Sequence, residues 1–336
     1  MNQSPDHPIR KLLILTYHRL QLWIAPAWFA EQLRKEFPQF DVSQLNSYEN
    51  VEPEIADAEI MFGISLRPEQ FRAAKKLRWI HSQAAAVHQL MFPELVKSDV
   101  IVTNSRDVHG PVVAEQVIGM IFALAKQIPA AVRFQLKHEW AQGVISSMEP
   151  PREIAGATLG LVGLGSIGRN VAKHAAALGM RVIAVREHPE KEKPENVDEV
   201  WPSSQLSTLL VQSDYIVLST PVTSETTGMI GREQFAAMKP HARLINVGRG
   251  PLIDEAALIA ALRERKIAGA ALDVFDKEPL PPDSPLWNLD NLLITPHTAG
   301  ISEKMWERHY VLFSENLRRY LSGQPLLGLV NKQRGY

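Results

Sequence analysis

A glycine motif, Gly163-x-Gly165-x-x-Gly168, carries the plainest chemical signal in this sequence. It follows the apolar run Thr158 to Val162, which predicts a buried strand, and it precedes the alanine-rich residues from Val171 to Leu178, which predict a helix. Glycines in this pattern allow a tight turn, close approach of a pyrophosphate to the backbone, and close packing of the helix on the strand. A helix that begins here presents amides and a partial positive charge to phosphates. The sequence therefore predicts a dinucleotide site; the alternative is an ordinary glycine turn.

The residue that closes the next strand bears on the choice between the two nicotinamide dinucleotides. Arg181 to Val185 predicts that strand, and Arg186 follows it, 23 residues after Gly163. An acidic residue about 20 residues past the motif would bind the ribose hydroxyls, whereas an arginine can bind a 2′-phosphate. The neighbouring Glu187 argues for NAD(H), and a solvated surface arginine is the other alternative. We expect NADP(H) to be favoured, with NAD(H) possible.

Composition excludes several classes of function. A chain of 336 residues suggests about two domains, and 45% hydrophobic and 22% charged residues are ordinary for a globular protein. The net charge of -1 gives no indication of nucleic acid or of an anionic membrane as a partner. The absence of cysteine rules out disulfides, thiolate catalysis and cysteine-bound metals, and we expect no metal site. The amino-terminal residues are polar and no apolar run is judged to approach transmembrane length, so we expect a cytoplasmic protein.

Short strands alternate with helices along the chain, a pattern typical of doubly wound parallel sheets. The first lobe is expected to hold strands at 11–16, 59–63, 77–81 and 100–103 and helices at 27–37 and 68–76. The middle lobe is expected to hold a six- or seven-stranded sheet, with strands at 158–162, 181–185, 214–219, 243–247, 269–274 and 292–295. A buried helix at 112–126 with Pro111 at its first turn, a polar connector at 129–156 and a closing helix at 302–321 complete the prediction.

Three further motifs follow predicted strands. They are Asn246-Val247-Gly248-Arg249-Gly250-Pro251, Leu272-Asp273-Val274-Phe275-Asp276-Lys277-Glu278-Pro279 and Thr295-Pro296-His297-Thr298-Ala299-Gly300. Arg249 and Glu278 are 29 residues apart, and Glu278 and His297 are 19 apart. With the glycine motif and Thr220-Pro221, and over nearly the whole chain, the sequence resembles the D-isomer-specific 2-hydroxyacid dehydrogenases. That family includes glyoxylate/hydroxypyruvate reductases and D-lactate and phosphoglycerate dehydrogenases.

The resemblance implies an architecture. It consists of two Rossmann- or flavodoxin-like lobes, each a doubly wound α/β unit with a parallel sheet, and an active site in the interdomain cleft at the carboxyl ends of strands. Residues 1–108 and 300–336 would form the substrate (catalytic) domain, and residues 109–299 the NAD(P)-binding domain. The family favours homodimers, and the apolar helix at 112–126 is consistent with a subunit contact.

Three motif residues fit the chemistry of reducing a 2-keto acid. Arg249 could pair with the substrate carboxylate through two hydrogen bonds and polarise the ketone. His297 could protonate the carbonyl oxygen, and Glu278 beside it would favour the proton-carrying imidazole. Taken singly, each residue has a plainer explanation, namely a surface turn, a solvated glutamate and a core histidine. Their joint occurrence at strand ends favours catalysis.

The resemblance also assigns binding roles. Asp273 would bind the nicotinamide carboxamide, and the pyrophosphate and adenosine side would be contacted by Ser166, Ile167, Thr220, Pro221 and Val247. The segment Ser82 to Val87 aligns with the loop whose amides hold the substrate carboxylate, with Ala85 and Ala86 as the binding residues. The family usually has glycine at the position of Ala86, so this chain has less backbone freedom there, which narrows the pocket and bears on the identity of the substrate.

The function predicted from the sequence is the reversible reduction of a small 2-keto acid, such as glyoxylate or hydroxypyruvate, to the D-2-hydroxy acid with NADPH or NADH. Two alternatives stay open. One is a reductase for a larger 2-keto acid. The other is a corepressor-like sensor that binds the dinucleotide without significant turnover, which the near-neutral charge and the lack of partner-binding tails disfavour.

Overall fold

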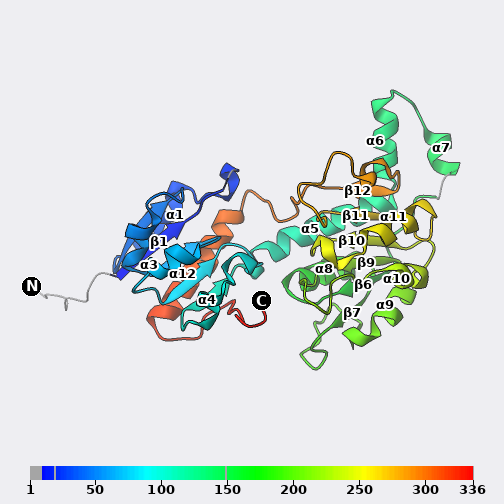
Figure 1. Ribbon diagram of the computed structural model, residues 1–336. Helices are drawn as coiled ribbons and strands as arrows, with labels where there is room; N and C mark the ends of the chain where they lie inside the picture. Colours follow the sequence, from blue (N-terminus) through cyan, green and yellow to red (C-terminus); the bar gives the residue numbers. More distant parts are fainter. Residues whose placement is uncertain (1–9, 19, 148–149, 336) are drawn as a thin grey trace, which may run out of the picture. The chain divides into compact units, whose positions relative to one another are not determined.

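The computed structural model describes residues 10–18, 20–147 and 150–335. Their contacts divide the chain into two compact units, one reaching to His109 and resuming at Ser302, the other running from Gly110 to Ile301. Each unit holds one parallel sheet with helices beside it (Figure 1). The predicted fold class, two doubly wound α/β units, is confirmed. The domain boundaries expected from the sequence lie one or two residues from these divisions.

The first unit is built on five parallel strands in the order β2-β1-β3-β4-β5. The strands are β1 Arg10–Leu15, β2 Phe40–Leu45, β3 Ala58–Gly63, β4 Trp79–Ser82 and β5 Ile101–Asn104. The helices are α1 Ala27–Glu36, α2 Val51–Ala56, α3 Pro68–Ala73, α4 Pro93–Lys97 and, from the carboxyl-terminal segment, α12 Met305–Leu321.

Strand β1 is buried on both of its faces. Successive side chains of a strand point to opposite sides of the sheet, so those of β1 alternate between two clusters of buried residues. Leu12 and Ile14 pack in a cluster with residues of α1 and α12, whereas Leu13 and Leu15 pack in a second cluster with residues of α2 and α4. Phe313 of α12 lies 4.9 Å from the Phe62 ring of β3. The carboxyl-terminal helix is therefore part of the core of the first unit.

The second unit holds seven parallel strands in the order β12-β11-β10-β9-β6-β7-β8. The strands are β6 Thr158–Val162, β7 Arg181–Arg186, β8 Glu199–Pro202, β9 Tyr215–Leu218, β10 Arg243–Asn246, β11 Gly269–Leu272 and β12 Leu292–Ile294. The helices are α5 Arg106–Ala125, which begins in the first unit, α6 Ile128–Leu136, α7 Gln142–Ser147, α8 Ser166–Ala177, α9 Leu206–Gln212, α10 Arg232–Ala237 and α11 Glu255–Arg263.

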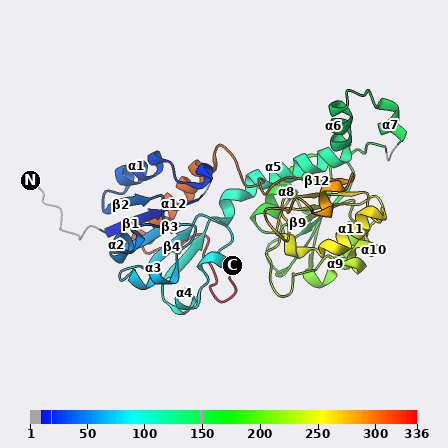
Figure 2. The ribbon, with the colours of Figure 1, turned by 45° about the horizontal axis from the view of Figure 1, so that its top comes forward.

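Helices cover both faces of this sheet. Side chains of α5 and α8 pack in one cluster of buried residues, and those of α9, α10 and α11 pack in another (Figures 1 and 2). The direction of the strand order reverses between β6 and β9, and open α/β sheets bind ligands at the carboxyl ends of strands beside such a reversal. The glycine motif directly follows β6, so the fold places it at that point.

The structure departs from the sequence prediction in several places. Strand β8 and five short helices were not predicted, namely α2, α4, α9, α10 and α11. Helix α5 begins six residues before Val112, so Pro111 lies inside the helix and not at its first turn. The expected polar connector contains α6 and α7. Strand β2 was not predicted at all, although Phe40 and Val42 are buried and Asp41 between them is exposed, the alternation of an edge strand.

Helix α5 also corrects the expectation that no run approaches transmembrane length. Arg106–Ala125 is long and apolar enough to cross a membrane by length and composition alone. In the structure 44% of its most apolar window is buried, and Val113, Val117 and Ile121 pack in the core of the second unit. Core helices meet the same criterion, so the criterion carries little weight for this helix.

Candidate functional site

The glycine turn after β6 requires glycine at two of its three positions. Gly163 has a φ of +97°, a left-handed conformation that side chains disfavour, and a Cβ there would lie 3.1 Å from the Thr220 amide nitrogen. A Cβ on Gly168 would lie 2.3 Å from the Gly163 carbonyl oxygen. The turn therefore packs tightly against the end of β9 and against its own helix.

The space beside Gly165 is open, in contrast to that beside the other two glycines. A Cβ on Gly165 would meet no atom of the described residues within 4 Å. Gly165 is the N-cap of α8, and no side chain accepts hydrogen bonds at this helix start. The first amides of α8, including those of Ser166 and Ile167, and the positive end of the helix dipole thus point toward accessible space. These residues fit the pyrophosphate of a dinucleotide.

Arg186 lies at the end of β7, as predicted, next to the glycine turn, whose Gly163 amide donates to the Val185 carbonyl at 3.0 Å. The Arg186 guanidinium is held by its own loop. Its Nη2 donates to the carbonyl oxygens of Pro189 at 3.4 Å and Glu192 at 3.2 Å, and also to that of Lys191. A phosphate at this strand end would compete with these carbonyl oxygens for Nη2.

The ends of β9 and β10 contribute Thr220, Pro221 and Val247 to the neighbourhood of the turn. A Cβ on Gly248 would lie 3.0 Å from the Thr220 carbonyl oxygen, so the two strand ends touch. Val247 is buried, and the Pro221 carbonyl accepts a hydrogen bond from Thr226 Oγ1 at 2.8 Å. The predicted cofactor-binding residues of the second unit thus share one edge of one sheet.

Arg249 follows β10 and is fixed by its backbone. Asn246, which is fully buried, donates from Nδ2 to the Arg249 carbonyl at 2.9 Å and accepts from the Gly248 amide at 3.0 Å. A Cβ on Gly250 would lie 1.9 Å from the Phe275 carbonyl carbon, so the chain passes here only with glycine. Burial lowers the pKa of the half-buried Arg249 guanidinium, and the negative charge of Glu278 opposes that shift.

Glu278 and His297 form a direct pair. His297 Nδ1 lies 2.6 Å from Glu278 Oε2, and Glu278 Oε1 accepts a hydrogen bond from the Phe275 amide at 2.9 Å. The carboxylate thus uses one oxygen for the backbone and the other for the imidazole. The side chains of His297 and Glu278 are 49% and 33% exposed, so the imidazole edge that carries Nε2 is accessible.

Asp273 holds the segment that carries His297. Its carboxylate is buried and accepts hydrogen bonds from Thr295 Oγ1 at 2.5 Å and from the Thr298 and Ala299 amides, both at 3.0 Å. The Asp273 carbonyl accepts from the His297 amide at 2.9 Å. His297 itself has a φ of +55°, a left-handed conformation that is uncommon for non-glycine residues and that these four bonds maintain.

The sequence analysis missed Asn246 and Thr295, although both belong to the quoted motifs. Asn246 fixes the turn of Arg249, and Thr295 donates to the carboxylate that holds the His297 segment. A polar residue directly after the apolar Leu244 and Ile245 of a strand, as Asn246 is, could have indicated a buried side chain that bonds to the backbone.

Ala85 and Ala86 belong to the first unit and follow β4. The Ala85 carbonyl accepts a hydrogen bond from Asn104 Nδ2 at 2.8 Å, and both alanines are half-buried. Neither residue is among those with a positive φ, so alanine in place of glycine brings no backbone strain at Ala86. The hydrogen bond from Asn104 lies within the first unit.

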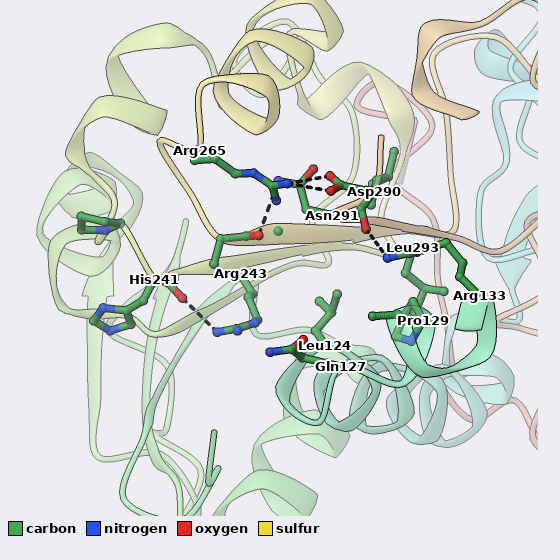
Figure 3. Close-up of a pocket in the computed structure, with 15 residues that line it drawn as sticks. Leu124, Gln127, Pro129, Arg133, His241, Arg243, Arg265, Asp290, Asn291 and Leu293 are labelled. Atoms are coloured by element: carbon green, nitrogen blue, oxygen red, sulfur yellow. Dashed lines mark hydrogen bonds and ion pairs between the residues drawn. The ribbon is translucent and has the colours of Figure 1, made fainter. Parts of the chain in front are cut away.

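A cavity of the second unit lies elsewhere, at the amino ends of β10, β11 and β12 (Figure 3). Its volume is about 540 Å³, and it contains none of the site residues predicted from the sequence. The cavity is therefore separate from the candidate site at the carboxyl edge of the sheet. Among the described residues no cluster of histidine and carboxylate side chains could hold a metal ion.

Comparison with known proteins identifies the family. The model of the "D-isomer specific 2-hydroxyacid dehydrogenase, NAD binding domain" matches residues 118–299. The glyoxylate reductase of Korarchaeum cryptofilum is 37% identical over 269 residues, which is 79% of either chain. The glyoxylate/hydroxypyruvate reductase B of Pectobacterium carotovorum is 34% identical over 311 residues, which is 90% of this chain and 96% of the relative.

Two solved structures share the whole fold. A D-isomer specific 2-hydroxyacid dehydrogenase family protein from Aeromonas salmonicida superposes with a TM-score of 0.83 at 33% identity, covering 96% of this chain and 99% of its own. A D-isomer specific 2-hydroxyacid dehydrogenase from Xanthobacter autotrophicus, in complex with NADPH and MES, gives 0.81 at 30% identity, covering 97% and 99%. The chain belongs to the D-isomer-specific 2-hydroxyacid dehydrogenase family and is an NAD(P)-dependent oxidoreductase by class.

Proposed function

We propose that this chain reduces a small 2-keto acid of the glyoxylate or hydroxypyruvate type to the D-2-hydroxy acid, reversibly, with NADP(H) preferred over NAD(H). The observation that carries the proposal is the Glu278–His297 pair, with 2.6 Å between carboxylate and imidazole, which shares one sheet edge with Arg249 and the glycine turn. Relatives named for reduction of glyoxylate and hydroxypyruvate support the substrate class.

In this proposal the three side chains divide the work on the substrate. The nicotinamide, when bound, supplies the hydride that reaches the keto carbon. Arg249 pairs with the carboxylate and draws electron density from the ketone oxygen, because its guanidinium remains charged in spite of burial. His297 holds a proton on Nε2 and donates it to that oxygen, which leaves the hydroxy acid. Glu278 favours the proton-carrying imidazole and orients it through Nδ1.

The first unit, in the same proposal, contributes to binding of the substrate carboxylate. The backbone of Ala85 and Ala86 would hold it. Asn104 supports this loop, since its side chain donates to the Ala85 carbonyl. The methyl group of Ala86 occupies volume that glycine would leave free, so we expect short 2-keto acids to be better substrates than long ones.

Arg186 is proposed to give the preference for NADP(H). A 2′-phosphate offers stronger, charged acceptors than the three loop carbonyls that Nη2 now contacts, so the exchange is favourable. The relative from Xanthobacter autotrophicus was solved with NADPH, which supports a cofactor that carries a 2′-phosphate. Replacing Arg186 with Asp should turn the preference toward NAD(H). An unchanged ratio of kcat/KM for the two cofactors would remove Arg186 from the account.

We further propose a cytoplasmic homodimer. The apolar side chains of α5 that are only partly buried, Ile118, Phe122 and Leu124, support a contact with a second subunit.

The alternative function, a dinucleotide sensor without turnover, would leave the Glu278–His297 pair without a catalytic role. A panel of 2-keto acids, followed by NADPH and NADH absorbance, separates the two. Turnover of a short keto acid supports the reductase, and inertness across the panel with measurable cofactor binding supports the sensor.

A further inference from the structure

Buried polar side chains are concentrated in the first unit where β4 and β5 end. Six residues there are almost fully excluded from solvent, namely His81, Ser82, Gln83, Thr103, Asn104 and Ser105. Buried polar groups are hydrogen-bonded as a rule, and replacing a bonded pair by apolar groups of the same shape can be nearly neutral for stability. Stability alone therefore does not account for this group of residues, and its hydrogen bonds lead to the loop that follows β4.

A series of hydrogen bonds runs from the Trp79 indole to the carbonyl of Ser82. Trp79 Nε1 donates to Thr103 Oγ1 at 2.8 Å, and that hydroxyl lies 2.7 Å from His81 Nδ1. His81 Nε2 lies 3.1 Å from Ser105 Oγ, which donates to the Ser82 carbonyl at 2.8 Å. His81 and Thr103 are paired directly across β4 and β5, so their side chains share one face of the sheet. We name Trp79, Thr103, His81 and Ser105, with these bonds, the His81 network.

The hydrogen bonds of the network have one direction. Full burial lowers the pKa of His81 to about 3, so the imidazole is neutral near neutral pH and carries a single hydrogen. The Ser105 hydroxyl uses its hydrogen for the Ser82 carbonyl, so His81 Nε2 is the donor to Ser105. His81 Nδ1 is then an acceptor, and the Thr103 hydroxyl donates to it. Every donor and acceptor in the series is used once, from the Trp79 indole to the Ser82 carbonyl.

Hydrogen bonds from the same strand ends fix the carbonyls of the loop after β4. The Ala84 carbonyl accepts from Ser82 Oγ at 3.1 Å and from the Ser105 amide at 3.4 Å. The Ala85 carbonyl accepts from Asn104 Nδ2 at 2.8 Å. Ser82 Oγ also accepts from the Ala84 amide at 3.2 Å, so Ser82 is bonded through its carbonyl and its hydroxyl. Both loop carbonyls are therefore turned toward Asn104 and Ser105, at the end of β5.

The planarity of the peptide bond relates these carbonyl bonds to the direction of the amides. In a trans peptide the carbonyl of one residue and the amide of the next point in opposite directions. The Ala84 and Ala85 carbonyls point toward β5 and both peptides are trans, so the amides of Ala85 and Ala86 point away from it. Neither amide has an acceptor among the described residues, and both residues are half-buried. The loop thus presents two adjacent, unbonded amides while its carbonyls are held.

We propose that the His81 network, together with Asn104, positions these two amides to receive the substrate carboxylate. His81, Ser105 and Asn104 are positioning residues, because each acts through the loop and none contacts the substrate in this account. The inference rests on the proposed function, in which the Ala85 and Ala86 amides bind that carboxylate. Donors that need no rearrangement bind an anion at the lowest entropic cost, so a loop held from behind raises the affinity for substrate. Loss of a positioning residue should weaken substrate binding and leave hydride transfer and cofactor binding nearly unchanged.

Ser105→Ala is the first test, because it removes one hydroxyl and leaves the His81 ring in place. The KM for the 2-keto acid that wild-type protein reduces best should rise about three- to tenfold, the loss expected for one hydrogen bond. The kcat and the dissociation constant of NADPH should stay within about twofold. The control is Ser314→Ala, which removes a buried hydroxyl of the same unit that donates to the Val311 carbonyl within α12. An unchanged KM in Ser105→Ala, or an equal rise in the control, overturns the proposal.

Two changes at His81 separate the role of its nitrogens from that of its shape. Phenylalanine keeps a planar ring beside Phe62, whose centroid lies 5.5 Å from that of His81, but it has no hydrogen-bonding atom. Glutamine carries a donor and an acceptor on one planar amide. We expect His81→Phe to raise KM at least as much as Ser105→Ala does, and His81→Gln to recover part of the loss. Equal KM values for the two His81 variants overturn the proposal, and Ser105→Ala carries the test if His81→Phe does not fold.

Calorimetry with oxamate in the presence of NADPH tests the positioning without turnover. Oxamate has the carboxylate and the adjacent carbonyl of a 2-keto acid, but its amide does not accept a hydride. Its dissociation constant should be about three- to tenfold higher for Ser105→Ala than for wild-type and Ser314→Ala protein. That result supports the positioning even if wild-type protein is inert with every 2-keto acid, which would overturn the proposed function alone. Equal oxamate affinity in an active wild type and in Ser105→Ala overturns the positioning alone, and a wild type that neither turns over a keto acid nor binds oxamate overturns both.

Discussion

Carboxylate side chains at the two edges of the seven-stranded sheet have different roles. At the amino edge, Asp214 and Asp198 accept amides at the starts of β6 and β7, from Thr158 and Val182, each at 2.7 Å. Asp214 also accepts from Lys239 and His241, both at 2.8 Å. At the carboxyl edge, Glu278 meets one backbone amide and His297, whose other ring nitrogen stays accessible. The carboxylates at the amino edge, whose hydrogen bonds all go to groups of the protein, stabilise the fold. Glu278 instead contacts an imidazole that is accessible to a substrate, so it can take part in a reaction.

Asp273 shows that the comparison depends on bonding and not on which edge a residue occupies. It stands at the carboxyl edge, and yet its carboxylate is filled by Thr295, Thr298 and Ala299. Its contribution here is to hold His297 in a left-handed conformation. The role in binding the nicotinamide carboxamide, which the resemblance implies, would have to use the remaining acceptor capacity of this residue.

The largest expected effect is that of His297→Ala. Removal of a general acid should lower kcat/KM for 2-keto acid reduction by about 10²–10⁴-fold. Binding of NADPH, followed by fluorescence titration, and the thermal midpoint should change little, because the His297 side chain is half exposed. A variant that retains more than a tenth of wild-type turnover would remove His297 from the chemistry.

Arg249→Lys should have the next largest effect. Lysine keeps the positive charge but loses the forked geometry that pairs with a carboxylate, and hydrogen bonds to charged groups contribute about 1.5–3 kcal/mol. We expect kcat/KM to fall by about 10- to 100-fold, mostly through KM, in steady-state assays with glyoxylate. The control is Arg243→Lys at the amino edge, which should leave KM unchanged. Equal KM changes in both variants would contradict the distinction between the edges.

Asp214→Ala should alter stability and leave turnover per folded molecule within about twofold. Burial opposes ionisation of Asp214, but hydrogen bonds from Lys239, the Thr158 amide and His241 outweigh it and hold the pKa of this carboxyl below its ordinary value. Its stabilising contribution is therefore present above about pH 4 and is lost as the pH falls through the lowered value. Urea denaturation at pH 7 should show a loss of about 1–3 kcal/mol. A large fall in kcat with an unchanged midpoint would argue against a structural role.

The smallest effect is expected at His309, in the first unit, which contrasts with the exposed His297. His309 is fully buried, its two ring nitrogens have no hydrogen-bond partner, and burial together with His109 and His81 lowers its pKa well below 6.5. Unfolding lets it take up a proton, so stability falls as the pH drops below about 6.5. His309→Leu should flatten that fall by about 1.4 kcal/mol at pH 5.5, measured by urea midpoints at pH 5.5 and 8. Parallel pH curves for both proteins would contradict it.

Much of the fold is legible in the sequence because its strands are short apolar runs buried on both faces. Thr158–Val162 and Gly269–Leu272 are of this kind, and the glycine turn has a local pattern. Helices α6 and α7 escaped prediction because they are short and bury only Ala130, so packing on a core does not distinguish their sequence from that of a connector. The start of α5 was predicted too late because Pro111 favours the first turn of a helix. In the structure the packing of the helix, with Gly110 against Ser166, overrides that preference.

The candidate site was predictable in its members and not in its bonding. The motifs name Arg249, Glu278 and His297, but the contacts that fix them depend on the tertiary structure. Asn246 bonds to a turn three residues away, whereas Thr295 and Asp273 meet across 22 residues of sequence. The cavity at the amino edge of the sheet was not predictable, since its lining comes from two helices, loops and strand starts spread from Leu124 to Leu293.

The kcat/KM of Glu278→Gln for reduction of a 2-keto acid tests the central claim most directly. Glutamine preserves the shape of the side chain and can still accept from the Phe275 amide, but it removes the negative charge beside His297. Because that charge supports the proton-donating imidazole, the account predicts that kcat/KM falls at least about tenfold while NADPH binding is unchanged. A variant with the kcat/KM of the wild type would contradict the claim that this carboxylate supports the acid.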